Sequence, residues 1–193
     1  MAGFVAIQFH HESPDGLSWG AHLCQFYHNA SDWLDLSTRY FLSGLSQNQY
    51  CLWILPAVIK RRDFDQMIEA KPPFKEAVLS GQMEIVTAVK WYSLKTGFDP
   101  KKVIHCMDEH YKEALKKGYE GIRVAGGPHH IREKSVWKRF TDYEKKVQSE
   151  IKSRKIIALC THSFVECPLS AMNSLIQSHD KTLIRRGGDW EVL

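Results

Sequence analysis

Short apolar segments alternate with longer amphipathic segments along most of the chain. Six runs have the length and apolar character of buried strands, namely residues 22–27, 50–55, 83–88, 121–127, 155–162 and 181–186. In the intervening segments apolar residues recur every three or four positions, which predicts helices from Ser31 to near Gly44, over 61–70 and 74–80, from Asp99 to Gly118, from Ser135 to Ile151 and from Pro168 to near His179. Ser31 and Ser135 are the expected N-caps. The alternation is typical of an α/β protein.

Helices between successive strands favour a mainly parallel sheet, because parallel neighbours need a long crossover connection. The run from Ile156 to Leu159 is apolar at every position, as expected of a strand covered on both faces. The predicted fold is therefore a three-layer α/β sandwich with helices on both faces of the sheet. No repeat or linker divides the chain, so we expect an N-terminal extension over residues 1–18 and a single domain over residues 19–193. The tail at 185–193 is either an edge strand or a protein contact.

The carboxyl ends of the strands are the expected ligand-binding edge of such a sheet. The ligand-binding residues predicted around this edge are Tyr27, His28, Trp91, Tyr92, Arg123, Gly126, His129 and His162. Trp91 and Tyr92 can either form an aromatic wall for the ligand or pack their own loop. His129 either contacts the ligand or lies in an exposed loop. Arg123 lies within a predicted buried strand and needs a partner there, for which Glu144 is the candidate in a structural ion pair.

Composition limits the function classes further. The 193 residues are 44% hydrophobic, which is enough to bury the core of one domain. The net charge of +4 comes from 26 basic and 22 acidic residues spread along the chain, and this disfavours direct nucleic-acid binding. No long apolar span or signal peptide is evident, so we expect no membrane segment. The five cysteines form no CxxC pair and are typical of reduced thiols in a cytoplasmic protein.

Several short motifs together resemble the MEDS sensory domain, a family named for methanogens, methylotrophs and the regulator DcmR. The residues that carry the resemblance are the H-x-C-x-F-Y pattern at His22, Cys24, Phe26 and Tyr27, followed by Arg123, Tyr143, Glu144 and Cys160. It extends from about Trp19 to Gly188. The resemblance implies a sensor that recognises a hydrocarbon derivative or methylated one-carbon compound without catalysing a reaction. The family is often fused to DNA-binding or kinase domains. No such domain is evident in the sequence, so we expect a separate signalling or regulatory protein as the partner. A homodimer is also compatible with the sequence.

The MEDS family itself resembles a divergent branch of the RecA and KaiC ATPases. In those ATPases the first strand leads into a glycine-rich loop with a lysine, which holds phosphates. The matching segment here, Tyr27 to Ser31, contains neither glycine nor lysine, and no carboxylate follows the strands at 50–55 and 121–127, where magnesium or the attacking water would need one. We therefore expect no ATP hydrolysis. Pro128 after Gly127, and His162 in place of an aromatic residue, depart from the family pattern and leave the ligand class open.

Two short patterns, His22-x-Cys24 and Cys160-x-His162, contain candidate metal ligands. Residues two apart on a strand face the same side, and in a RecA-like strand order the first strand lies beside the fifth. Four nitrogen and sulfur ligands can then converge on zinc or another thiophilic metal. The alternative is that both cysteines are small core residues, with His22 hydrogen-bonded at its strand start and His162 in the mouth of the crevice.

A cysteine–histidine enzyme is a further alternative, with Cys24 or Cys160 as the thiolate and His28 or His162 as the base. Such a thiolate needs a helix N-terminus or a nearby cation to lower its pKa. Cys24 lies inside a predicted strand, and no third residue that would orient a base is evident near Cys160. We therefore predict no catalytic residues.

Overall fold

The computed structural model describes residues 17–56, 59–92, 97–127 and 134–193. The strands are β1 His22–Tyr27, β2 Tyr50–Leu55, β3 Met83–Thr87, β4 Ile122–Gly126, β5 Ile156–Ser163, β6 Lys181–Arg186 and β7 Asp189–Val192. The helices are α1 Ala30–Ser46, α2 Arg61–Glu69, α3 Pro72–Ser80, α4 Ala88–Trp91, α5 Pro100–Lys116, α6 Lys134–Ile151 and α7 Leu169–Gln177. The six predicted strands are therefore present at nearly their predicted bounds.

The strands form one sheet in the order β3-β2-β4-β5-β1-β6-β7. The pairs β1 with β5, β1 with β6, β2 with β3, β2 with β4 and β4 with β5 are parallel, whereas β7 is antiparallel to β6. The predicted mainly parallel sheet is confirmed. The tail is an edge strand, since Arg185 pairs with Trp190 across the β6–β7 hairpin.

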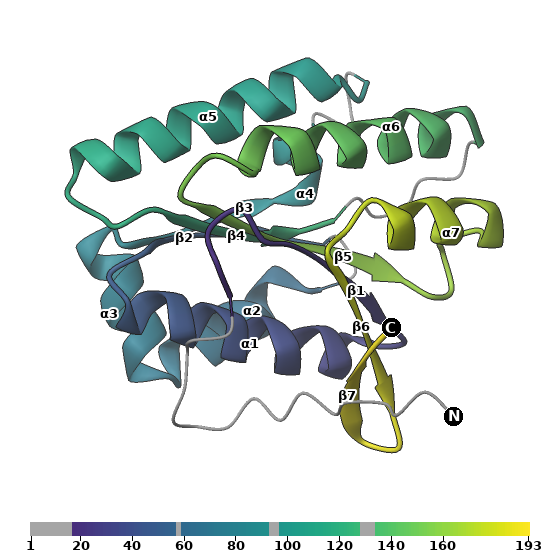
Figure 1. Ribbon diagram of the computed structural model, residues 1–193. Coiled ribbons are helices and arrows are strands. Elements are labelled where there is room, and N and C mark those ends of the chain that lie inside the picture. Colours follow the sequence, from purple (N-terminus) through teal and green to yellow (C-terminus); the bar gives the residue numbers. More distant parts are fainter. Residues whose placement is uncertain (1–16, 57–58, 93–96, 128–133) are drawn as a thin grey trace.

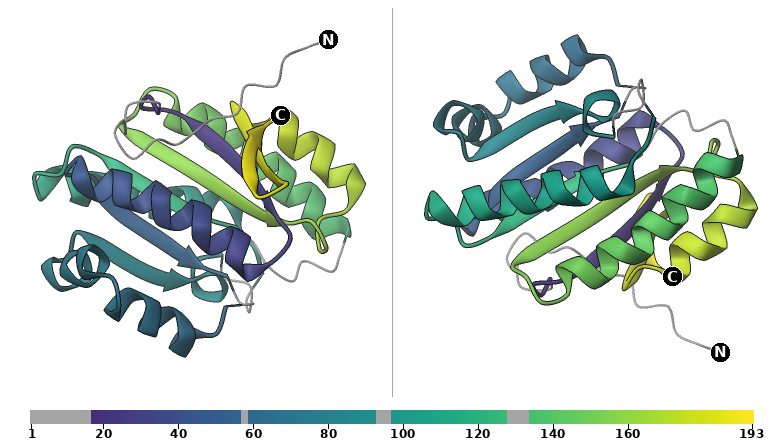
Figure 2. Two further views of the ribbon diagram at one scale, coloured as in Figure 1. Left: turned by 90° about the horizontal axis from the view of Figure 1, so that it is seen from below. Right: turned by 90° about the horizontal axis from the view of Figure 1, so that it is seen from above.

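Helices cover both faces of the sheet, as Figures 1 and 2 show, and so complete the predicted three-layer sandwich. One face carries α1, α2 and α3, and the other carries α5, α6 and α7. The core under α1–α3 is built around the aromatic side chains of Trp33, Phe41, Trp53, Phe64 and Phe74. The core under α5–α7 includes Phe26, Tyr92, Phe98, Phe140 and Tyr143. We call these two sides of the sheet the α1–α3 face and the α5–α7 face.

Both predicted N-cap residues are wrong, by about two residues each. The N-cap of α1 is Asn29, whose Oδ1 accepts a hydrogen bond from the Asp32 backbone N–H, and Ser31 lies inside the helix. Asparagine and serine are comparable N-caps, so propensity could not separate the two positions. Helix α6 begins at Lys134, one residue before the predicted cap at Ser135. Such shifts leave the packing of both helices on the sheet unchanged.

The structure overturns the predicted ion pair between Arg123 and Glu144. Arg123 points to the α1–α3 face, where Nε donates to Gln49 Oε1 (2.7 Å) and Nη1 donates to the Tyr40 carbonyl oxygen (2.8 Å). Its guanidinium carbon also lies 4.8 Å from the centroid of the Tyr40 ring. Glu144 lies on α6 and contacts His22 from the opposite side of the sheet. Side chains alternate along a strand, so Arg123 and its neighbours Ile122 and Val124 face opposite layers.

Arg123 is 1% exposed, and its hydrogen bonds tie β4 to α1 and to the residue before β2. Replacing Arg123 with lysine keeps the charge but removes the planar fork that reaches both acceptors. We expect Arg123→Lys to lower the free energy of unfolding by about 2–3 kcal/mol, measured by urea denaturation. The matched control is Arg39→Lys, because the Arg39 side chain is 53% exposed in an ion pair with Asp35 on the same helix; it should change stability by less than about 0.5 kcal/mol. Equal effects of the two changes would contradict the structural role given to Arg123.

Candidate functional site

The parallel register of β1 and β5 brings the two predicted metal-ligand patterns together. Cys24 is paired with Cys160, and His22 is paired with Ala158. His22 and Cys24 lie on the α5–α7 face of β1, and Cys160 and His162 lie on the same face of β5, as the alternation predicted. Side chains from α6 and from the segment between α7 and β6 complete the site.

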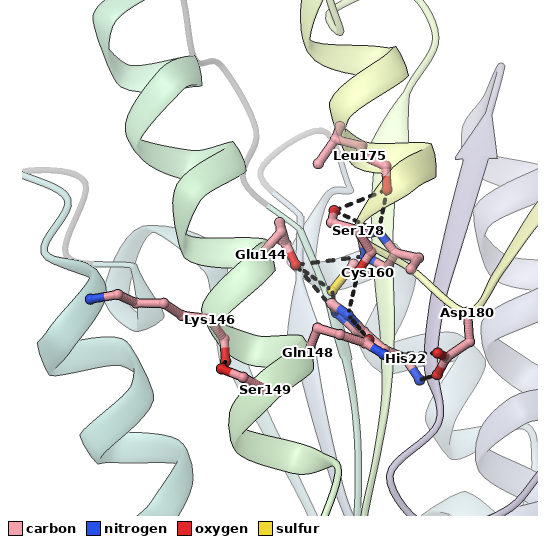
Figure 3. Close-up of polar contacts among 10 residues, drawn as sticks. His22, Glu144, Lys146, Gln148, Ser149, Cys160, Leu175, Ser178 and Asp180 are labelled. Atoms are coloured by element: carbon pink, nitrogen blue, oxygen red, sulfur yellow. Dashed lines mark hydrogen bonds and ion pairs between the residues drawn. The ribbon is translucent and has the colours of Figure 1, made fainter.

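Three side chains from three elements meet under α6 (Figure 3). His22 Nε2 lies 3.2 Å from Cys160 Sγ and 3.3 Å from Glu144 Oε2. The Cys160 thiol donates to Glu144 Oε2 over 3.1 Å. All three side chains are at most 9% exposed. Glu144 thus reaches from α6 to the sheet, while Lys146 on the same helix points away from it.

Two more histidines lie beside this group. The ring centroids of His179 and His22 are 3.9 Å apart, and His179 Nε2 lies 3.6 Å from Glu144 Oε2. The centroid of the His162 ring lies 5.6 Å from that of the Phe26 ring and 5.8 Å from that of the Phe140 ring. Among the described residues, neither ring nitrogen of His162 has a hydrogen-bond partner, and neither does His179 Nε2. Buried polar atoms rarely remain unpaired, so these nitrogens mark a place where a further group can bind.

Hydrogen bonds outside the cluster fix which nitrogen faces it. His22 Nδ1 lies 2.9 Å from Gln148 Oε1 and 3.2 Å from the Ser178 carbonyl oxygen, so Nδ1 carries the donated hydrogen. Gln148 in turn donates to Asp180 Oδ1 (2.8 Å). His179 Nδ1 donates to the Leu175 carbonyl oxygen (2.6 Å). Both rings therefore present Nε2 to Glu144.

Burial dominates the electrostatics of the cluster. Burial raises the pKa of the Cys160 thiol well above its usual value, and the Glu144 carboxylate raises it further. The pKa of Cys24 is raised by burial and by Glu144 in the same way. Burial lowers the pKa of His162 to about 4 and that of His179 to about 3. The thiolate is the reactive form of a cysteine, so burial keeps both thiols in their less reactive, protonated form.

The pKa of Glu144 is not governed by burial, in contrast to the pKa values of its neighbours. Burial favours the protonated form of its carboxyl group, but the hydrogen bond from His22 and the nearby imidazoles outweigh that effect and lower its pKa. The group is thus an anion in a nearly solvent-free place. A buried carboxylate of this kind requires compensating positive charge or strong donors.

The other predicted ligand residues do not line one crevice. Tyr27 lies in the core of the α1–α3 face, and Tyr92 lies in the core of the α5–α7 face, where its ring centroid is 6.2 Å from that of Phe140. His28 is exposed at the end of β1 and stacks on Phe164, with 4.5 Å between the ring centroids. Trp91 packs edge-on against His110.

Gly126 and His129, the two remaining predicted ligand-binding residues, have different outcomes. Gly126 has a packing role, because a Cβ there would lie 2.4 Å from Ile54 Cβ. His129 lies outside the described residues. An open surface hollow on α2, lined by Arg61, Arg62, Asp65, Gln66, Glu69 and Ala70, contains none of the predicted ligand residues.

The N-terminus of α1 holds a carboxylate of the chain itself. Asp32 Oδ1 accepts from Arg185 Nη1 (3.0 Å), and Oδ2 accepts from the His28 backbone N–H (3.3 Å). In a phosphate-binding ATPase this end of the helix faces the nucleotide. Here the negative charge comes from Asp32, and Arg185 from β6 compensates it. The residues at this junction therefore do not fit a nucleotide phosphate.

Sequence reasoning missed two members of the cluster. The sequence analysis predicts Glu144 as the ion-pair partner of Arg123. However, Glu144 lies four residues after Phe140 and three before Val147, on the apolar stripe of its helix. A charged residue within such a stripe was the available signal for a buried partner. His179 lies just after α7, and its position against His22 depends on the β1–β6 pairing, which no local pattern indicated.

The layered parallel sheet and the cluster under α6 define an α/β protein with a RecA/KaiC-like fold and a histidine–cysteine–carboxylate site. The chain belongs to the family described as "MEthanogen/methylotroph, DcmR Sensory domain" (MEDS), which matches residues 21–180. No curated protein matches the sequence. In the part of the chain that the structure describes, no helix is both long and apolar enough to span a membrane.

Solved structures with a similar fold include two archaeal proteins. A KaiC-like protein from Pyrococcus horikoshii OT3 is 11% identical, with a TM-score of 0.61 over 88% of this chain and 72% of that one. The flagellar accessory protein FlaH from Methanocaldococcus jannaschii is 15% identical, with a TM-score of 0.54 over 92% of this chain and 78% of that one. At such identities the likeness concerns the fold alone.

Asp32 should contribute to stability as an anion at the α1 N-terminus. We expect Asp32→Asn to lower the free energy of unfolding by about 1–2 kcal/mol, because it weakens both the ion pair with Arg185 and the interaction with the helix dipole. The measurement is urea denaturation followed by circular dichroism. Asp65→Asn is the control, since Asp65 is half exposed in an ion pair with Arg61, and its effect should stay below about 0.5 kcal/mol. An unchanged free energy of unfolding in Asp32→Asn would show that this carboxylate has no such role.

Proposed function

We propose that this MEDS domain is a non-catalytic sensor that binds a small hydrocarbon derivative or methylated one-carbon compound beside His162. A separate regulatory protein then reads the occupied state. The family membership supports the sensory role in general. The ligand, the binding place and the partner are the parts proposed here.

The observation that carries the proposal is the environment of His162. Its side chain is 1% exposed, it is packed between Phe26 and Phe140, and both of its ring nitrogens are unpaired among the described residues. An aromatic enclosure with one polar group is the usual design of a small-molecule site. A bound molecule with a polar atom would supply a hydrogen-bond partner for the imidazole.

The size of the ligand is limited by this burial. Phe26, Phe140 and His179 surround the imidazole closely, so a molecule of only a few heavy atoms suits the place. Very small ligands gain at most about 1.5 kcal/mol per heavy atom. Two heavy atoms then give about 3 kcal/mol, and the dissociation constant is weaker than about 1 mM. Such affinity suits a sensor of an abundant metabolite.

Nucleotide-driven function is disfavoured by the same chain. The junction from Tyr27 to Ser31 has no glycine or lysine, and Asp32 supplies a negative charge at the helix end that would face a phosphate. Repulsion between the carboxylate and a phosphate opposes binding there. We therefore propose that the protein is not an ATPase.

Ligand binding can be tested on the histidine rings themselves. We expect that methanol, dichloromethane or dimethyl sulfide, titrated in turn, shifts the ring ¹⁵N resonances of His162 in a saturable way, measured by long-range ¹H–¹⁵N NMR. His162→Leu should abolish saturable binding, because it removes the polar contact while keeping an apolar side chain. The control is His28→Leu, which removes an exposed histidine at the end of the neighbouring strand β1 and should leave binding unchanged.

Two results would contradict the proposed ligand site. Binding that survives His162→Leu would move the site elsewhere, and the absence of any saturable shift with all three probes would overturn this ligand class. Circular dichroism of each variant shows whether the fold persists.

We also expect that the protein neither binds nor hydrolyses ATP. A ligand that binds the folded state raises the unfolding temperature. We expect MgATP at millimolar concentration to leave the thermal midpoint unchanged and to release no phosphate over time. A rise in the midpoint, or steady phosphate release that the purified Asp32→Asn variant alters, would contradict the non-ATPase assignment.

A further inference from the structure

We propose that His22, Glu144, Cys160 and His179 form a binding site for one divalent metal ion of the zinc type. This set differs from the one expected from sequence, because Glu144 and His179 replace Cys24 and His162. The inference goes beyond the sensory function proposed above and does not rest on it, since the metal binds without any organic ligand.

The spacing of the donor atoms fits a tetrahedral ion. All four ligand atoms lie within 4.8 Å of one another. Four of the distances between them are 3.1, 3.2, 3.3 and 3.6 Å. Metal–ligand bonds of about 2.0–2.3 Å give a tetrahedron with edges of roughly 3.3–3.8 Å. A metal ion can therefore enter with only small side-chain movements.

Protons alone leave this cluster incompletely satisfied. A protonated His22 would donate to Glu144, and the Cys160 thiol donates to the same oxygen. His179 gains nothing from that arrangement, because its Nε2 has no hydrogen-bond partner among the described residues and faces the carboxylate at 3.6 Å. The His179 side chain has no exposed surface, so water outside the protein does not reach it. A metal ion would satisfy this nitrogen and the other three donors at once.

The hydrogen bonds outside the cluster have the arrangement that orients metal-bound histidines. Such histidines donate their second N–H to a carbonyl or carboxylate, which fixes the ring and the tautomer. His22 Nδ1 contacts Gln148 Oε1 and the Ser178 carbonyl, and His179 Nδ1 donates to the Leu175 carbonyl. Both Nε2 atoms are thereby directed to the same point.

The charges also balance. Coordination removes the proton of the Cys160 thiol, which leaves one thiolate, one carboxylate and two neutral imidazoles. With a divalent ion the sum is zero. A neutral assembly is far easier to bury than the lone Glu144 carboxylate, which is 1% exposed. The mixture of sulfur, nitrogen and oxygen donors favours zinc or cobalt over magnesium or calcium.

A second group, Cys24, His162 and His179, competes for the same ion. Its three ligand atoms also lie within 4.8 Å of one another. It offers one donor fewer and only one anionic ligand, and none of the residues that the structure describes forms a hydrogen bond that would orient the His162 ring. The four-residue set is therefore the better site. The two cysteines distinguish the groups experimentally.

The test uses the full-length chain, stripped with a chelator and titrated with Co²⁺ and then Zn²⁺, without organic ligand. We expect one metal per chain by elemental analysis, visible bands of tetrahedral cobalt and a near-ultraviolet thiolate-to-cobalt band. Cys160→Ser should lose the thiolate band and bind cobalt at least 10-fold more weakly. The matched control Cys24→Ser, a buried cysteine on the adjacent strand, should keep the band. Gln148→Ala should keep the band but weaken binding about 10–100-fold, because it removes the hydrogen bonds to His22 and Asp180 but no metal ligand.

Three outcomes would overturn the proposal. They are the absence of stoichiometric cobalt or zinc binding, a thiolate band that survives Cys160→Ser, and loss of the band in Cys24→Ser. The last would assign the metal to the group around His162. Glu144→Gln, which is nearly isosteric, gives an independent check: it should weaken binding while circular dichroism stays unchanged. The NMR titrations with organic probes are separate, so failure of either proposal is seen on its own.

Discussion

The parallel pairing of β1 with β5 is the constraint on which the rest of the site depends. Its register sets Cys24 against Cys160, so the chemically active residues of both strands fall on one face. A slip of one residue would turn the side chains of one strand to the α1–α3 face and separate the two patterns. The register is held because both faces are buried, with different residues specified for each core.

The sequence allowed the sheet and half of the cluster to be predicted, for a physical reason. Strand residues alternate with a period of two, so His22-x-Cys24 and Cys160-x-His162 could be assigned to common faces without coordinates. The predicted partner of Arg123 was wrong because alternation gives the relative faces of residues in one strand but not which layer each face meets. Arg123 and Glu144 could be placed only once β4 and α6 were docked. His179 depends on a turn between α7 and β6, and no period describes that.

The α1 N-terminus explains how the fold persists without a phosphate loop. In proteins with a phosphate-binding loop, the exposed N–H groups at the start of such a helix are satisfied partly by the phosphate. Here Asn29 caps the helix, Asp32 lies in its first turn, and Arg185 from β6 compensates the charge. The edge hairpin is tied in further, because Trp190 Nε1 donates to Asp35 Oδ2 (2.8 Å). Interactions within the chain thus stabilise the helix end, and the chemically interesting groups lie elsewhere, beneath α6.

The position of the cluster determines how occupancy can be transmitted. Its members come from β1, α6, β5 and the segment after α7, which are brought together only by the tertiary fold. An ion bonded to all four elements stabilises their common arrangement by the binding free energy. His162 lies next to this group, with its ring centroid 6.3 Å from that of His179, so a molecule bound there contacts the same docked helices. Under both proposals the metal fixes the positions of α6 and of the segment after α7, and the small ligand at His162 acts on the same two elements.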